Sequence, residues 1–251
     1  QAFSLYEPQF HPVLLHEDGL DPVQLGHTLN SFPIRLFYGV PNSQNPSGVT
    51  YSEERRHELA KILTPYNTIF VEDDAYGELN FEGRSLSSMY RFLPDRTVIT
   101  GSFSKILAPG MRMGWVVAPP AIMEQLIIAK QASDLHSNYL CQRIAYQYLT
   151  CENIDAKIAI IREKYRAQGN LMAQLVKELM PASVTCTVPK GGMFVWVTLP
   201  DGIDSMDVFE HAIKEQVAVL PGTPFYTDGG GTNTLRLNFS NSTPEKILMG
   251  M

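Results

Sequence analysis

A lysine, an arginine and two serines lie close together in the stretch SFSKILAPGMRMGW, residues 102–115. Lys105 stands between small residues shortly after the apolar run TVIT (97–100), and Arg112 follows seven residues later. A lone lysine is usually a solvent-facing charge. A lysine held rigidly after a buried strand can instead act as a nucleophile or a base, and serine hydroxyls with an arginine suit a phosphate. The stretch therefore has two interpretations, a surface charge or a reactive site.

Three further polar groups follow or interrupt apolar runs. Asn45 opens NPSG, Asp73 and Tyr76 lie in VEDDAYGEL, and Arg236 lies between two leucines in NTLRLNFS. Each has an ordinary structural interpretation as well. Asn45 suits a turn, Asp73 with its neighbour Asp74 suits a loop or a helix cap, and Arg236 suits an edge strand. Together these groups are more informative than any one of them.

The elements that would position these groups alternate between strands and helices. Apolar runs predict strands over 34–40, 68–73, 97–101 and 115–118. These runs are apolar on both faces, as in a parallel sheet covered by helices. Thr50 and Glu53 form a possible capping box for the helix that follows the first strand. In such a sheet, ligands bind beyond the carboxyl ends of the strands, where these polar groups are found.

The second half of the chain has a different pattern of predicted elements. Two long helices are predicted over 121–149 and 152–180. Shorter elements follow: strands in 183–188, 193–199, 217–220 and 234–240, a helix over 205–216, and a last helix beginning at Thr243-Pro244-Glu245. We therefore predict a large α/β domain over 1–150 and, over 151–251, a linking helix with a smaller α+β domain.

The composition excludes several classes of partner. The net charge is −6 with a pI near 5.5, and there is no basic block, which argues against nucleic acid. No uncharged apolar run approaches the roughly 20 residues of a membrane span, and residues 1–20 do not resemble a signal peptide, so we expect a cytoplasmic protein. The three cysteines are widely spaced, which favours reduced thiols, and the histidines lack metal-ligand spacing, so no metal is expected.

One ligand suits a carboxylate, a phenol, two hydroxyls, a lysine and an arginine at one sheet edge. It is pyridoxal phosphate, which uses a lysine Schiff base and an acidic partner for its ring nitrogen. The chain resembles the fold-type I aminotransferases of class I/II, in the branch of 2-aminoadipate and aromatic amino-acid aminotransferases. The stretches that carry this resemblance stand in family order: PNSQNPSG, VEDDAYGEL, GSFSKILAPGMRMGW, PKGGMFVWVTLP, VLPGTPFY and NTLRLNFS.

The resemblance implies a role for each candidate. Lys105 matches the Schiff-base lysine that also moves the proton, and Asp73, three residues before Tyr76, matches the partner of the ring nitrogen. Tyr76 and Asn45 match the partners of the phenolic oxygen. Arg236, with Asn45, matches the site for the substrate α-carboxylate, which a planar guanidinium binds through two hydrogen bonds.

The remaining candidates match contacts to the cofactor phosphate: Ser102, Ser104 and Arg112. The implied fold is that of the pyridoxal-phosphate-dependent transferases of fold type I, with a mainly parallel central sheet, helices on both faces and a smaller C-terminal α+β domain. The resemblance also implies a homodimer.

The implied activity is transfer of an α-amino group from 2-aminoadipate, an aromatic or a branched-chain amino acid to a 2-oxo acid such as 2-oxoglutarate. Two alternatives share the scaffold: the cofactor-sensing domain of a winged-helix transcription regulator, and a lyase or decarboxylase. Family members are longer, and residues 1–33 contain no counterpart of their glycine-rich phosphate turn or of the aromatic residue that stacks on the ring. We therefore expect a fragment that lacks the N-terminal third and the last helices, in which QAFSLYEPQF forms a strand and loop.

Overall fold

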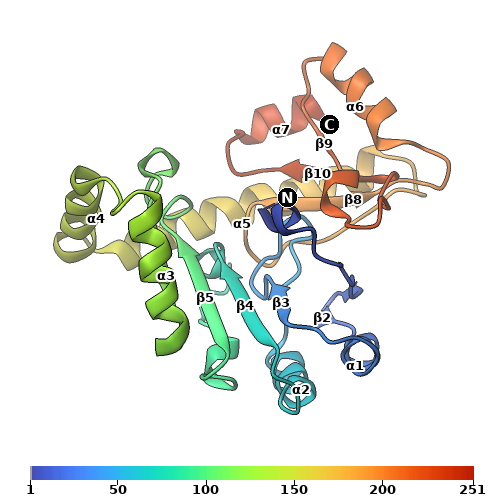
Figure 1. Ribbon diagram of the computed structural model, residues 1–251. Helices are drawn as coiled ribbons and strands as arrows, with labels where there is room; N and C mark the ends of the chain where they lie inside the picture. Colours follow the sequence, from blue (N-terminus) through green and yellow to red (C-terminus); the bar gives the residue numbers. More distant parts are fainter. Residues whose placement is uncertain (1) are drawn as a thin grey trace.

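The computed structural model describes residues 2–251 and contains two four-stranded sheets. A long helix, α5 (Ile154–Leu179), runs between them (Figure 1). Helix α5 packs on the second sheet and reaches the first through a short 3₁₀ helix, η2 (Gly77–Leu79). The predicted helix over 152–180 is therefore confirmed within two residues at each end.

The first sheet has the order β3-β4-β5-β6. Its strands are β3 (Leu36–Gly39), β4 (Ile69–Asp74), β5 (Thr97–Ser102) and β6 (Gly114–Val117). Strands β3, β4 and β5 are parallel, as predicted, but β6 is antiparallel to β5. The connection over 103–113 contains only the 3₁₀ helix η4 (Pro109–Met111) and is too short for the crossover that a parallel pair needs.

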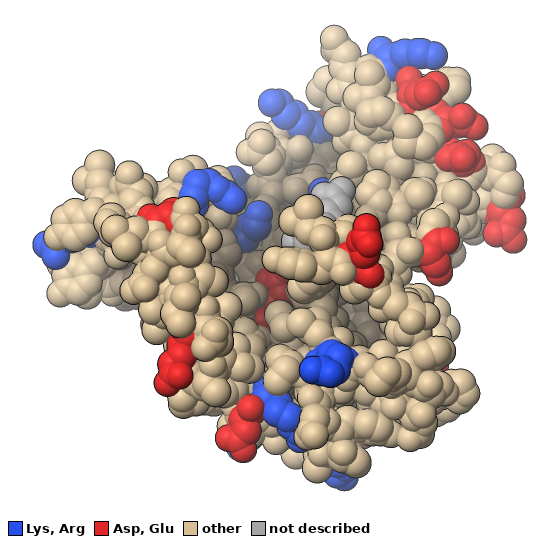
Figure 2. All heavy atoms as spheres, viewed as in Figure 1, with Lys and Arg blue, Asp and Glu red and all other residues tan. Residues whose placement is uncertain are grey.

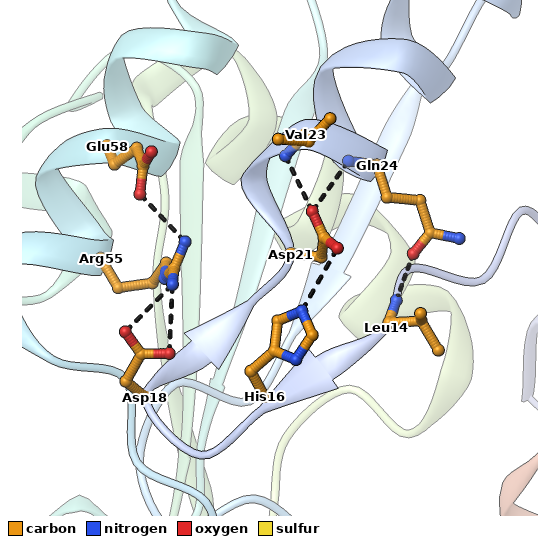
Figure 3. A network of polar contacts seen from close by, with 8 residues as sticks. All are labelled: Leu14, His16, Asp18, Asp21, Val23, Gln24, Arg55 and Glu58. Carbon is orange, nitrogen blue, oxygen red and sulfur yellow. Dashed lines mark hydrogen bonds and ion pairs between the residues drawn. The ribbon is translucent and has the colours of Figure 1, made fainter.

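Helices α1 (Pro22–Ser31) and α2 (Glu53–Leu63) pack together beside this sheet. Their apolar residues form a core with Phe70 of β4. A small hairpin of β1 (Leu15–His16) and β2 (Gly19–Leu20) precedes α1. Figure 3 shows how polar contacts attach this hairpin: Asp18 pairs with Arg55 of α2, while His16 contacts Asp21, the N-cap of α1.

The predicted capping box of Thr50 and Glu53 is wrong. Ser52, directly before α2, caps the helix by accepting a hydrogen bond from the Arg55 amide. Thr50 accepts from the Ser43 amide, and Glu53 accepts from the Ser87 amide. The nearer hydroxyl therefore caps the helix, and the two predicted partners connect loops instead.

The single helix predicted over 121–149 is also wrong, because the structure has α3 (Pro120–Ser133) and α4 (Tyr139–Cys151). Leu135 adopts a left-handed backbone with φ 64°, which ends the helical path. Asn138 then caps α4 by accepting from the Cys141 amide. A second, smaller correction concerns 205–216, where α6 (Ser205–Lys214) ends two residues early and Gln216 has φ 62°.

The second sheet is antiparallel and has the order β7-β8-β10-β9. Its strands are β7 (Thr185–Cys186), β8 (Phe194–Thr198), β9 (Leu220–Pro221) and β10 (Thr234–Asn238). The run predicted over 183–188 contains only a two-residue strand, and of the run predicted over 217–220 only Leu220 is in a strand. Helix α7 (Pro244–Gly250) begins after Thr243, as predicted. Residues from α5, β8, β10 and α7 form one apolar core.

Other segments are short and local. Ala2–Tyr6 forms a 3₁₀ helix, η1, where a strand and loop were predicted for residues 1–10; residue 1 lies outside the described residues. Two more 3₁₀ turns are η3 (Met89–Arg91) and η5 (Thr223–Phe225). Within residues 2–251, the helices are too short or too polar to cross a membrane.

Candidate active site

The predicted site residues come from both sheets. Asp73 lies near the carboxyl end of β4, where it is paired in register with Thr100 of β5. Ser102 ends β5, and Lys105 lies in the loop that follows. Arg236 comes from β10 of the second sheet. Figure 2 shows that the molecule is hollowed between its two sheets and that basic and acidic side chains are both visible in the hollow.

Asn45 and Arg236 are in direct contact although they are 191 residues apart in sequence. An Arg236 Nη donates to the Asn45 Oδ1 at 2.7 Å. Asn45 lies in a tight loop, closed by a hydrogen bond from the Gln44 amide to the Val49 carbonyl, and its peptide bond to Pro46 is cis. The structure therefore brings these two predicted site residues together.

Two aromatic rings lie against the side chain of Arg236. Its guanidinium carbon lies 4.2 Å from the centre of the Phe194 ring and 5.2 Å from that of Phe225. Burial lowers the pKa of Arg236, and the nearby Tyr76 opposes that change. An arginine remains charged even so. Its Nε is buried without a hydrogen-bond partner among the described residues.

Asp73 and Asp74 have different partners. The Tyr38 hydroxyl donates to the Asp73 Oδ2 at 2.6 Å, and the Asn42 amide donates to the Asp74 Oδ1 at 2.7 Å. Burial and the bond to Asp73 raise the pKa of Tyr38, so its phenol stays protonated and keeps donating at neutral pH. Asp74 is therefore engaged by a neighbouring loop, while Asp73 accepts from a phenol of the adjacent strand.

Tyr76 lies between the two sheets. Its ring is buried and meets the Phe194 ring edge to face, with 5.9 Å between their centres. The Lys105 Nζ lies over the same ring, 5.9 Å from its centre. Burial raises the pKa of Tyr76, and the positive charge of Arg236 opposes this rise. The structure thus brings Lys105, Tyr76 and Arg236 into one neighbourhood.

Two of the three residues predicted to bind phosphate are joined by a hydrogen bond. The Ser102 Oγ accepts a hydrogen bond from the Ser104 amide at 3.1 Å. Arg112 has a left-handed backbone with φ 53°, and its guanidinium donates to the Pro109 carbonyl within the same loop. In the described residues, Arg112 makes no hydrogen bond to either serine. The structure therefore joins the two serines and leaves Arg112 exposed nearby in the chain.

Sequence reasoning missed four residues that surround the site: Tyr38, Asn42, Phe194 and Phe225. One signal was available for Tyr38, because it is the only hydroxyl in the run over 34–40; it lies one residue before the end of β3, as Asp73 lies one residue before the end of β4. The two phenylalanines lie within stretches already singled out by the resemblance. Nothing in the local sequence indicates that their rings pack on Arg236.

Comparison with known proteins identifies the class. The family model for aminotransferase class I and II matches residues 18–250, and the chain belongs to that family. The solved structures that it resembles include LysN, the α-aminoadipate aminotransferase of Thermus thermophilus in complex with N-(5'-phosphopyridoxyl)-L-leucine, with TM-score 0.95 and 37% identity over 99% of this chain and 65% of that one. The predicted family and fold class are confirmed.

Similar proteins with assigned names include members of the same family. The chain is 39% identical to aromatic-amino-acid aminotransferase 1 of Thermococcus litoralis, over all of this chain and 62% of that protein. It is 36% identical to the 2-aminoadipate transaminase of Thermus thermophilus, over all of this chain and 64% of that protein. It is also 30% identical to an uncharacterized HTH-type transcriptional regulator of Bacillus subtilis, over 82% of this chain and 42% of that protein. The chain thus spans less than two thirds of the length of these relatives.

Proposed function

We propose that this chain is part of a pyridoxal-phosphate-dependent aminotransferase. It would transfer the α-amino group of 2-aminoadipate, an aromatic or a branched-chain amino acid to a 2-oxo acid such as 2-oxoglutarate. The observation that carries this proposal is the contact of Arg236 with Asn45 beside Lys105 and Tyr76. The names of two relatives, an aromatic-amino-acid aminotransferase and a 2-aminoadipate transaminase, support the choice of substrates.

The residues present fit the cofactor. Asp73 would pair with the ring nitrogen, and Tyr76 and Asn45 would contact the phenolic oxygen. The phosphate would be held by two hydroxyls and a guanidinium, from Ser102, Ser104 and Arg112. Lys105 would hold the aldehyde carbon. When bound, the group supplies a ring that accepts electrons from the bond broken at the substrate Cα.

The chain's own groups divide the remaining work. Arg236, oriented by Asn45 and by two aromatic rings, would bind the substrate carboxylate through two parallel hydrogen bonds. A planar pair of bonds fixes the direction of the Cα–H bond. The Lys105 amine, once free, would remove that proton as a base and return it as an acid. The phenol of Tyr38 would keep the Asp73 carboxylate in place.

The domain organisation, assembly and location belong to the same proposal. Residues 1–150 would form the large cofactor-binding domain, and residues 151–251 the linking helix and small domain. Two features support this division: the first sheet lies within 36–117 and the second within 185–238, with α5 between them. We also propose a homodimer in the cytoplasm, without nucleic-acid or membrane partners.

The test uses the complete protein. Purified protein with added pyridoxal phosphate is expected to show a visible absorption band that survives dialysis, and amino acids with 2-oxoglutarate are expected to give glutamate. Lys105→Ala should remove both the band and the turnover. Lys130→Ala, which removes a surface lysine paired with Asp134 on α3, is the matched control and should leave both intact. A wild-type protein with neither band nor turnover would overturn the proposal.

A second candidate is the sensing domain of a transcription regulator, which the similarity to the HTH-type regulator favours. Such a protein would show the band without forming glutamate, and its complete chain would bind DNA. Product analysis separates the third possibility, because a lyase or decarboxylase would consume the amino acid without a 2-oxo acid acceptor.

A further inference from the structure

Arg56 of α2 is a completely buried charged residue, with 0% of its surface exposed. Its guanidinium makes four hydrogen bonds. The Nε donates to the Tyr51 carbonyl at 3.1 Å, and one Nη donates to the Ser87 carbonyl at 3.0 Å. The other Nη donates to the Pro41 carbonyl at 3.0 Å and to the Asn42 Oδ1 at 2.6 Å. Burying a charged side chain costs free energy, and hydrogen bonds such as these offset that cost. We therefore ask what these bonds hold in place.

The bonds of Arg56 meet at the loop that carries Asn45. Pro41 and Tyr51 are the two ends of this loop, and they are already joined by a hydrogen bond from the Tyr51 amide to the Pro41 carbonyl at 2.8 Å. The guanidinium therefore binds both ends of the loop at once. It also ties them to Ser87, which lies in a third segment. The position of Asn45 at the tip follows from how firmly these ends are held.

A second path leads from Arg56 to the end of β4. Asn42 accepts from Arg56 and donates its own amide to the Asp74 Oδ1 at 2.7 Å. The Asp74 carboxylate in turn packs against Gly77, where a Cβ atom would lie only 2.4 Å from the Oδ1. Tyr76 lies in the turn between Asp74 and Gly77, and Asp73 directly precedes this turn.

Acidic groups surround the buried guanidinium without pairing with it directly among the described residues. Glu72, Glu53 and Asp74 lie near enough to stabilise its charge, while burial lowers the pKa of Arg56. Glu72 itself accepts from the Ser88 hydroxyl and the Met89 amide. The hydrogen bonds of Arg56 thus go to backbone carbonyls and one amide oxygen, which is an arrangement for fixing loops.

We propose that Arg56 is a positioning residue for the active site. It holds the loop over 41–51 so that Asn45 meets Arg236, and through Asn42 and Asp74 it fixes the turn that carries Asp73 and Tyr76. This inference rests on the proposed function for its catalytic consequences. Its structural part, the hold on the loop, stands independently of which reaction the site performs.

The first test compares Arg56→Lys with Arg55→Lys in the complete protein. Arg55 is the adjacent residue of α2, but it pairs with Asp18 and Glu58 on the outer side. A lysine keeps the charge of Arg56 but cannot reproduce a planar fork. We expect Arg56→Lys to speed amide hydrogen exchange in the loop over 41–51 about tenfold or more in the protein without cofactor, and Arg55→Lys to leave it unchanged. Equal exchange in the two variants would overturn the inference.

The second test measures catalysis. In the loaded enzyme, Arg56→Lys should raise the KM for the amino acid by about tenfold, because Arg236 loses its orientation by Asn45, and should also shift the pH midpoint of the cofactor absorption band. A merely structural role would lower thermal stability and leave KM and that midpoint unchanged, which would contradict the proposal. An inactive wild-type enzyme would refute the proposed function, while the exchange experiment would still decide the role of Arg56.

Asn42→Ala keeps the test decisive if Arg56→Lys does not fold. It removes only the path to Asp74 and leaves the three carbonyl contacts of Arg56 in place. We expect faster exchange over 73–79 and a shifted band midpoint, with a smaller change in KM than Arg56→Lys gives. Unchanged exchange and an unchanged midpoint in Asn42→Ala would refute the second path.

Discussion

The two sides of the candidate site differ sharply in how they are packed. On one side, β8 and β10 lie in a core with α5, and Val195 and Val197 are completely buried. On the other side, all four residues of β6 are exposed, α3 has no buried residue, and α4 has only Ala145. Large apolar side chains on this second side are exposed, among them Trp115, Ile128 and Tyr139.

This difference extends to the site residues. Asn45, Asp73 and Arg236 have side-chain hydrogen-bond partners from distant segments. The loop over 102–112 is held by bonds within itself, such as those of Ser102 and Arg112. Apolar composition alone therefore does not produce a core, because a side chain is buried only where another element covers it. The following predictions test this contrast.

The largest effect is expected in the packed core. Phe239 is completely buried and contacts the rings of Phe81 and Tyr165. Phe239→Ala should lower the free energy of unfolding by about 3–5 kcal/mol, because it removes a buried ring and leaves a cavity. Ile128 of α3 is 58% exposed. Ile128→Ala should therefore change the free energy of unfolding by less than about 0.5 kcal/mol. Urea denaturation of both variants measures the contrast, and equal losses would contradict it.

Hydrogen exchange should show the same contrast without mutation. Amides of β8 and β10 are expected to exchange at least about tenfold more slowly than the helical amides of α3 and α4, because local opening is easiest where few apolar contacts must be broken. Mass spectrometry of the chain of residues 1–251 provides the measurement. Protection in α3 equal to that in β8 would show that the exposed face is stabilised in another way.

A moderate effect is expected from Tyr38→Phe, which removes the hydroxyl that donates to Asp73. Hydrogen bonds to charged groups contribute about 1.5–3 kcal/mol when buried, and less here because Tyr38 is half exposed. We expect the affinity of the complete protein for pyridoxal phosphate to fall about threefold to tenfold, measured by absorbance titration. Tyr139→Phe, on the exposed α4, is the control and should leave the affinity unchanged.

The smallest effect concerns alkaline pH. Burial raises the pKa of Tyr51 above its ordinary value of 10.0, so the folded state holds this proton more tightly than the unfolded chain does. The resulting stability is complete below the ordinary pKa and is lost as the pH rises through the higher folded pKa. Tyr51→Phe should therefore move the midpoint of alkaline unfolding upward, while the same change at exposed Tyr146 should not. A midpoint that Tyr51→Phe leaves in place would contradict this account.

The sequence by itself determined the features that depend on neighbouring residues. Apolar runs predicted the four strands of the first sheet, the residue pattern over 152–180 predicted α5, and Thr243-Pro244 predicted the start of α7. Short motifs identified the family and the candidate residues around Lys105, because a motif is a local pattern of residue types. Local patterns failed where a nearer partner or a backbone turn intervened, as at Ser52 and Leu135.

Only the tertiary structure decided which distant groups meet. The direction of β6, the bond between Asn45 and Arg236 and the bond between Tyr38 and Asp73 each depend on how separate elements pack. Arg56 looks like an ordinary surface arginine in ERRHEL, yet it is the one of the adjacent pair that is buried. Burial and pairing across a long sequence separation are properties of the assembled fold, and local periodicity contains no information about them.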